Sequence, residues 1–181
     1  MMGAHAEQDA REGFAASREK FAGVLAWLEG DETAGLEHAE LESALEVEGR
    51  ELIRLLLQDH LDLRAHREQR LETVVDAAGV DHGSVEAGHE RALATVFGAV
   101  RVERLAYRRR GNANLHPADG ALNLPAGKHS HGLRRLAAIE AARGSFDQAV
   151  DAVDRACGQQ LGKRQVEELA AATVVDFEAY Y

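Results

Sequence analysis

Apolar positions recur with a helical period through the first third of the chain. The first stripe has spacings of 7, 3, 1 and 3 residues and consists of Phe14, Phe21, Val24, Leu25 and Leu28. This is the pattern of an amphipathic helix. Gly30 and Asp31 follow the stripe, and they predict the end of that helix.

A second, longer helix is expected from about Leu36 or Glu46 to about Leu71. Its segment LIRLLLQDHLDL places apolar side chains around most of the helix, so the helix must be covered on more than one side. Packing against the first helix and against a second copy of the protein would provide that cover.

The period changes in the middle of the chain. Residues 76–90, DAAGVDHGSVEAGHE, contain three glycines and little periodicity, and we interpret them as a linker. ALATVF, Gly98 and AVRVERLAY then alternate with a period of two, which predicts a β-hairpin turning at about Phe97 to Ala99. Apolar residues of the second strand fall on both parities, so a bulge is expected near Glu103 and Arg104.

Helical periodicity returns after a segment rich in Gly, Asn and Pro at residues 111–132, which we interpret as an ordered loop. GLRRLAAIEAAR ends at Gly144, and SFDQAVDAVDRA begins with Ser145, which can form a capping box with Gln148. A turn through Gly158 and Gly162 leads into KRQVEELAAATVVDFEAYY. Three helices are therefore expected over residues 131–181.

Together these patterns predict a mainly α protein with a small β-hairpin, divided into four regions. Residues 1–75 form an acidic helical region that pairs protomers, and residues 76–90 form the linker. Residues 91–130 form the arginine-rich β-hairpin and the ordered loop. Residues 131–181 form a three-helix unit, with its last two helices in a helix-turn-helix.

Charge is divided unequally between the two halves of the chain, although the net charge of the whole is -10. Residues 1–90 carry 8 basic and 21 acidic groups, a net of -13, whereas residues 91–181 carry 13 and 10, a net of +3. Within residues 91–143 the count is 10 basic against 3 acidic, a net of +7. A local basic patch of this kind attracts a polyanion even on an acidic protein.

Several classes of protein are disfavoured by the composition. The chain has no run of about 18 uncharged apolar residues and no signal-peptide layout at its start, so we expect a cytoplasmic protein without a membrane partner. A single cysteine, Cys157, excludes an intramolecular disulfide and a cysteine-paired zinc site. No nucleophile with an adjacent base and no phosphate-binding glycine loop is present, so the chain is interpreted as non-enzymatic and without a cofactor of its own.

Two sets of side chains are candidates for DNA contact. The arginines of the hairpin suit phosphate contact: Arg101, Arg104, Arg108, Arg109 and Arg110. The turn and first turn of the last helix offer side chains that bind phosphates or pair with guanine and adenine edges: Gln159, Gln160, Lys163, Arg164 and Gln165. The alternative for the second set is a plain three-helix bundle with a polar first turn.

Possible metal ligands are weaker candidates. Glu86 and His89 have the Glu-x-x-His spacing of di-iron bundles, but that site needs a second motif and two further glutamates. Asp59, Asp62 and His66 are explained better as a solvated helix face. His116, His129 and His131 could bind a metal or a phosphate, or simply lie on the surface.

Three segments of the chain resemble the amino-terminal region of bacterial insertion-sequence transposases of the ISKra type. They are ERALATVFGAVRVERLAYRRRG, NLHPADGALNLPAGKHSHGLRRLAAIEAARGSFDQAVDAV and GQQLGKRQVEELA. The helices AGLEHAELESAL and GRELIRLLLQDHLDLRAHRE agree, so the resemblance covers the chain from about Phe21 to Tyr181. Many relatives carry a cysteine-paired knuckle after the hairpin, where this chain has YRRRG. Zinc-dependent folding is therefore not expected here.

The resemblance implies a DNA-binding region that recognises the ends of a mobile element during transposition, a form of DNA recombination. In that family a ribonuclease-H-like domain with three acidic residues and a divalent metal follows this region. The sequence stops at DFEAYY, so the catalytic domain and its metal are expected to be missing and the chain to be inactive alone. Duplex DNA and a second copy of the chain are the expected partners.

Two other functions stay open from the sequence. One is an acidic helical interaction or dimerisation protein without a nucleic-acid role. The other is a stand-alone DNA-binding regulator.

Overall fold

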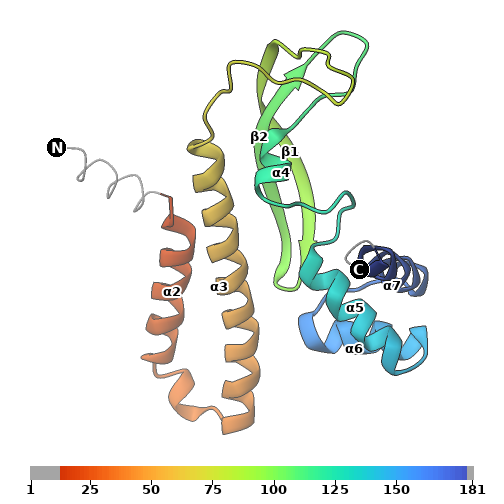
Figure 1. Ribbon diagram of the computed structural model, residues 1–181. Coiled ribbons are helices and arrows are strands. Elements are labelled where there is room, and N and C mark those ends of the chain that lie inside the picture. Colours follow the sequence, from red (N-terminus) through yellow and green to blue (C-terminus); the bar gives the residue numbers. More distant parts are fainter. Residues whose placement is uncertain (1–12, 179–181) are drawn as a thin grey trace, which may run out of the picture. The chain divides into compact units, whose positions relative to one another are not determined.

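The computed structural model describes residues 13–178, with side chains described up to Thr173. It is mainly helical with one two-stranded antiparallel sheet (Figure 1), as the sequence patterns predict. The ends of the predicted regions, residues 1–12 and 179–181, lie outside the described residues. In the described part, no helix is long and apolar enough to cross a membrane.

The chain divides into two compact units, and the division cuts across the hairpin. The first unit comprises the chain up to Arg91 together with Arg101–Asn123, and the second comprises Ala92–Val100 with the chain from Leu124 onward. The hairpin turn thus belongs to the second unit, whereas most of both strands belongs to the first. The sequence predicted four consecutive regions, with the hairpin within one of them. The structure divides the hairpin between the two units, and no sequence pattern indicated this division.

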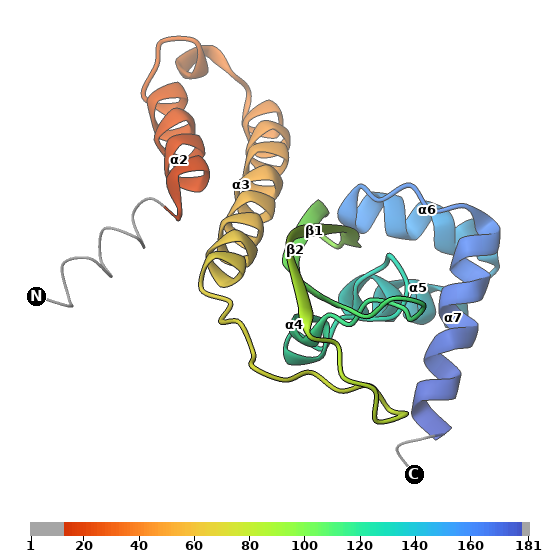
Figure 2. The same ribbon diagram turned by 90° about the horizontal axis from the view of Figure 1, so that it is seen from above.

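An antiparallel pair of helices forms the amino-terminal part of the first unit. Helix α2 spans Ala15–Leu28, a short 3-10 turn η1 spans Thr33–Gly35, and α3 spans His38–His66. The two helices lie side by side in Figures 1 and 2. Helix α3 begins with a capping box between Glu37 and Glu40, which satisfies backbone donors that a helix start leaves free.

The hairpin consists of β1, Ser84–Thr95, and β2, Gly98–Arg108. It is confirmed, with its turn one residue earlier than expected. Gly98 has a φ of 131°, a conformation that side chains other than glycine rarely adopt. The interpretation of residues 76–90 as a linker is wrong for residues 84–90, which pair in β1.

The expected bulge near Glu103 and Arg104 is also wrong. Burial alternates along β2 from Val100 to Ala106, through the positions where the bulge was expected, and the buried side chains of this parity are Val100, Val102, Arg104 and Ala106. The alternation ends at Tyr107, which is buried next to Ala106. The alternation breaks in β1 instead, where Gly88 has a φ of 77°. Glu86 and His89 therefore contact each other at 3.3 Å, although residues three apart in a regular strand face opposite sides.

Three packed helices form the second unit together with the hairpin turn: α5, His131–Arg143, α6, Phe146–Cys157, and α7, Lys163–Glu178. Ser145 and Gln148 make the expected capping box, and Gly158 ends α6 with a φ of 65°. The core of this unit consists of Leu133, Ala137, Ala149, Val153, Cys157, Leu161, Val166 and Leu169. The turn expected from Gly158 to Gly162 is confirmed.

The hairpin turn is hydrogen-bonded to the segment that leads into α5. The Ala94 backbone N–H donates to the Lys128 carbonyl at 2.7 Å, and the Ser130 N–H donates to the Ala94 carbonyl at 2.8 Å. The Ser130 side chain then caps α5 by accepting from the Leu133 N–H. The loop expected at residues 111–132 thus ends in this pairing, and it also contains a short helix, α4, Pro117–Ala121.

Candidate nucleic-acid interface

Three consecutive arginines emerge from the end of β2, and we call Arg108, Arg109 and Arg110 the arginine tip. All three are exposed. Arg108 forms an ion pair with Glu86, whereas Arg109 and Arg110 have no ion pair among the described residues. Two guanidinium groups are therefore available to an anion from outside the protein.

The arginine tip surrounds a shallow hollow of about 490 Å³. Its lining is polar and consists of Ser84, Arg108, Arg109, Arg110, Gly111, Asn112 and Asn114. Guanidinium, amide and hydroxyl groups all donate hydrogen bonds. The lining therefore suits phosphate oxygens, which accept strong bonds from arginine.

The loop that carries the arginine tip is closed at its base. Tyr107 and Leu115 exchange two backbone hydrogen bonds of 2.8 and 2.9 Å. Within the loop, the Asn112 backbone N–H donates to the Arg109 carbonyl at 3.0 Å, and Gly111 has a φ of 85°. These bonds hold the arginine backbone in a turn.

A buried histidine supports this loop from behind. The His82 side chain is buried, with Nδ1 at 3.2 Å from the Tyr107 carbonyl and Nε2 at 3.4 Å from Asp76 Oδ2. Asp76 also accepts a bond from the Asn112 side chain. The backbone N–H of Val80, then the bonds from His82 and Ala78, hold the pKa of Asp76 below its ordinary value.

Sequence reasoning missed this support. The turn at Asp76 could have been predicted from the sequence, because an aspartate that accepts from backbone N–H groups two and four residues later forms an Asx-type turn. The segment DAAGV fits that pattern. The contact of His82 with Tyr107 spans 25 residues, and no local pattern indicates it.

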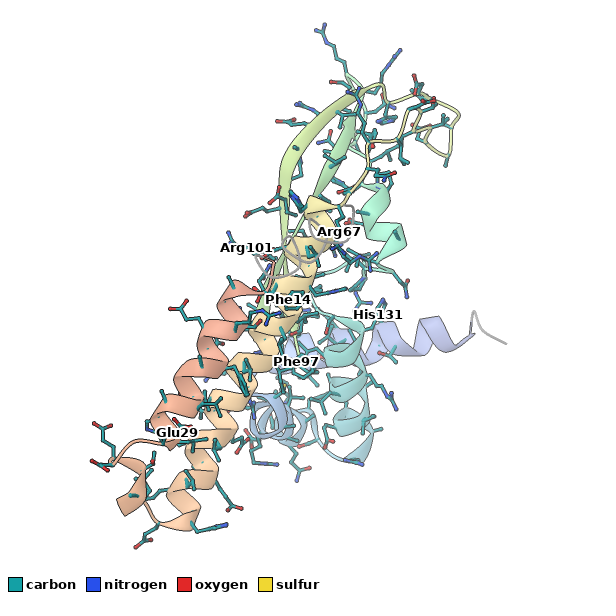
Figure 3. All side chains as sticks on the ribbon, turned by 90° about the vertical axis from the view of Figure 1, so that its left-hand side faces the viewer. Phe14, Glu29, Arg67, Phe97, Arg101 and His131 are labelled. Carbon is teal, nitrogen blue, oxygen red and sulfur yellow. The ribbon has the colours of Figure 1, made fainter. Side chains whose placement is uncertain are left out.

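Arg101 and Arg104 lie on the same strand but in opposite environments. The Arg101 side chain is 69% exposed and contacts Glu90 at 3.3 Å; Figure 3 marks Arg101. Its backbone is held by Gln58 of α3, which accepts from the Arg101 N–H at 2.8 Å and donates to its carbonyl at 3.0 Å. Arg101 is thus available for phosphate contact.

Arg104 is buried, so the expectation that it contacts DNA is not supported by its position. Its Nε lies 2.6 Å from Asp119 Oδ1, an ion pair whose angle is not that of a hydrogen bond. Its Nη1 donates to the His89 and Val102 carbonyls at 3.3 Å each. The alternation of β2 from Val100 to Ala106 places this arginine on the buried face with Val100 and Val102 and gives it a structural role.

Histidines near Arg104 do not form a metal site. The rings of His89 and His116 are 5.6 Å apart, and burial, followed by the charge of Arg104, lowers the pKa of His116. The Glu86–His89 pair lies on a strand, not on a helix as in a di-iron bundle. Among the described residues, no three potential ligands come close enough to hold a metal ion.

The second candidate set lies where α6 turns into α7. Lys163 Nζ contacts Asp147 at 2.8 Å, and Arg164 Nε contacts Glu168 at 3.0 Å with 89% of its side chain exposed. Gln165 Oε1 accepts from the Gly162 N–H at 2.9 Å, so its amide serves as a helix cap. Gln160 is exposed and Gln159 is half-buried.

The electrostatic surroundings of this set are acidic. Residues 146–178 carry 3 basic and 7 acidic groups, a net of -4, whereas residues 124–143 carry 4 basic and 1 acidic, a net of +3. Basic charge in the second unit therefore lies on α5 and the segment before it. The arginine tip belongs to the first unit and the Gln159–Gln165 set to the second.

Comparison of the chain with protein-family models, with curated proteins and with solved structures finds no match in any of the three. The resemblance to ISKra-type transposases therefore stays a hypothesis.

Proposed function

We propose that this chain binds duplex DNA through the arginine tip, as the DNA-binding region of an insertion-sequence transposase. The observation that carries the proposal is the exposure of Arg109 and Arg110, which have no carboxylate partner in the described part of the chain. Unpaired surface guanidinium groups favour contact with the phosphates of a polyanion.

The choice of a polyanion over a single phosphate rests on spacing. Arg101 lies seven residues before Arg108 on β2, a separation of about 23 Å along an extended strand. Duplex DNA offers a phosphate every few ångströms along each strand. A ligand that contacts both positions must therefore be long.

Sequence discrimination is assigned to the second unit. Arg164, in the first turn of α7, and Gln160, in the turn before α7, are exposed polar side chains that suit guanine and adenine edges. Gln165 is a weaker candidate than the sequence suggests, because its carbonyl oxygen already accepts from Gly162. The ion pair of Arg164 with Glu168 must open for a base contact, and at its high exposure this costs little.

The experiment is a titration of labelled duplex DNA at several salt concentrations. Replacing Arg109 and Arg110 by alanine should reduce the slope of log K against log salt by about two units and weaken binding to all sequences alike. The matched control replaces Arg18 and Arg50 on the acidic helices, which removes the same charge and should leave the slope unchanged. Equal slopes for wild type and the Arg109/Arg110 variant would reject the proposal.

A second candidate function is an interaction protein without a nucleic-acid role. It is favoured by the exposed apolar side chains of α2 and α3 and by the acidic charge of these helices. Absence of duplex binding at low salt would select it.

Reading the genomic DNA beyond codon 181, for an acidic catalytic domain flanked by inverted repeats, separates a transposase region from a stand-alone DNA-binding regulator.

A further inference from the structure

The second unit contains cationic side chains that no carboxylate neutralises. Its lysines and arginines are Lys128, Arg134, Arg135, Arg143, Arg155, Lys163 and Arg164. Arg143, Lys163 and Arg164 form ion pairs, whereas the other four have none among the side chains that the structure describes. Three of these four lie within residues 128–135, and we call Lys128, Arg134 and Arg135 the α5 basic cluster.

The sequence around the α5 basic cluster is free of acidic residues. Residues 124–139 contain no aspartate or glutamate, and neither do residues 92–100, the part of the hairpin that belongs to this unit. The hairpin turn is hydrogen-bonded to residues 128–130, so it brings no acidic side chain to the cluster. The positive charge is therefore not offset by its own segment or by the hairpin turn.

Helix α5 presents the cluster outside the core of the unit. Leu133 and Ala137 are fully buried and define the inner face of α5. At about 100° per residue, Arg135 lies about 200° round the helix axis from Leu133. Arg135 is exposed, as is Lys128 in the segment before the helix; Figure 3 marks His131, the first residue of α5. Two cations of the cluster are therefore accessible to an external anion.

The third cation, Arg134, turns back toward the segment before α5. A side-chain Cβ at Gly127 would lie 3.2 Å from Arg134 Nη2, so the guanidinium lies directly beside this glycine. Burial, followed by the charges of Lys128 and Arg134, lowers the pKa of His129, because both cations lie near its ring. Lysine, arginine and histidine groups thus converge at one place.

Arg134 lacks an internal partner for its charge. Its Nε is shielded from solvent and makes no hydrogen bond among the described residues, and no carboxylate in that part of the chain forms an ion pair with it. A guanidinium has five donors and no acceptor, and burial of an unpaired charge costs free energy. An anion bound beside Arg134 reduces that cost, so the cluster favours an anionic ligand.

We propose that the α5 basic cluster is a second contact with DNA phosphates, made by the second unit through Lys128, Arg134 and Arg135. The inference rests on the proposed function for its ligand, duplex DNA, but uses none of the residues to which that function is assigned. A polyanion is favoured over a single phosphate because unpaired cations occur in both units, here and at the arginine tip. One duplex releases counterions at every such contact, whereas a small anion can bind only one of the two sites.

The cluster supplies an attraction that the rest of the second unit lacks. Residues 146–178 have a net charge of -4, so α6 and α7 alone repel a phosphate backbone. Phosphate contacts at α5 position the unit without reading sequence, which leaves base contacts to exposed side chains such as Arg164.

The test is a titration of a labelled duplex of random sequence with the full chain at several salt concentrations. Replacing Lys128 and Arg135 by alanine should lower the slope of log K against log salt by about two units. It should weaken binding by about tenfold per lost contact at about 0.1 M salt. The matched control replaces Arg143 and Arg155, which removes the same charge from the same unit outside the cluster, and it should keep the wild-type slope.

Arg134 is tested by charge rather than by size. Arg134→Gln should lower the slope by about one unit, whereas Arg134→Lys keeps the charge and should keep the slope near that of the wild type. Both variants should keep the wild-type helicity in circular dichroism, because Arg134 makes no ion pair among the described residues. Equal slopes for Arg134→Gln and the wild type would overturn the role of Arg134.

The Arg109/Arg110 variant, measured in parallel, separates this inference from the proposed function. We expect both double variants to lower the slope, and their combination to lower it by about four units. If the Arg109/Arg110 variant lowers the slope and the Lys128/Arg135 variant does not, the inference is overturned while the proposed function stands. If only the Lys128/Arg135 variant lowers it, the inference holds and the arginine tip is not the contact. A wild-type chain that does not bind duplex DNA overturns both.

Discussion

Arg101 and Arg104 provide a sharp test, because they lie three residues apart on β2 and therefore on opposite faces of the strand. Replacing Arg104 by methionine keeps an apolar stem in the buried face but removes the guanidinium. Replacing Arg101 by methionine makes the same chemical change at an exposed position. The two variants should differ in stability because their environments differ.

The magnitude for Arg104 follows from its contacts. Removing one partner of a buried ion pair costs about 3 to 5 kcal/mol, but Asp119 is 28% exposed and keeps Arg91 at 3.5 Å, so water and Arg91 replace part of the interaction. The His89 and Val102 carbonyls each lose a donor, at about 0.5 to 1 kcal/mol each. We expect a loss of about 2 to 4 kcal/mol.

The Arg101→Met control should change stability by less than about 0.5 kcal/mol, because its ion pair with Glu90 is exposed on both sides. The assay is urea unfolding followed by the fluorescence of Trp27, the single tryptophan. Trp27 lies on α2 in the same compact unit as Arg104, so it reports the relevant transition. Equal, small losses for the two variants would refute the structural role of Arg104.

Three further outcomes are expected. Leu133→Ala, at a fully buried core position of α5, should destabilise the second unit by about 2 to 5 kcal/mol in chemical denaturation, and a loss below about 1 kcal/mol would contradict the packing. Gly158→Ala should cost about 1 kcal/mol in the same assay, because the φ of 65° penalises a Cβ, with Gly158→Asn milder. Bonds from Val80 and His82 lower the pKa of Asp76 below its ordinary value. The ionised carboxylate therefore stabilises the fold above about pH 4, and this contribution is lost as the pH falls through the lowered pKa. Asp76→Asn should flatten the acid side of a stability–pH profile.

Local signals explain why the second unit was predictable. Ser145 and Gln148 are three residues apart, and Gly158 directly follows the last apolar position of α6. Such caps depend on neighbours within one helical turn. The helix starts and stops of this unit therefore follow from the sequence without knowledge of the fold.

The first half of β1 could not be predicted in the same way. Residues 84–90 lack a regular alternation of apolar side chains, and Gly88 interrupts the strand with a left-handed φ. Their pairing with β2 determines the strand, and pairing partners distant in sequence leave no local pattern. An irregular, glycine-containing segment was thus mistaken for a linker.

Tertiary contacts also decided the roles of single residues at the candidate site. Gln58 holds the backbone of Arg101 from 43 residues away, and Asp119 holds Arg104. All five hairpin arginines appear equivalent in the sequence, and only the register of β2 separates the buried one from the exposed ones. The basic character of the hairpin was readable from composition, but its division into structural and surface charge was not.

The strong acidity of the chain is compatible with DNA binding because of where the charges lie in the first unit. Gln58 contacts Arg101, Glu68 contacts Leu105 and Leu71 contacts Tyr107, so α3 and the segment after it run alongside β2 in the same direction. The arginine tip follows Tyr107 directly, whereas the acidic residues 29–51 lie before Gln58 at the other end of α3. From Glu51 to His66 the helix rises by about 22 Å, more than two Debye lengths at physiological ionic strength, where one is about 8 Å. Salt therefore screens the arginine tip from the acidic end, and the net charge of -10 does not describe the potential that a phosphate meets there.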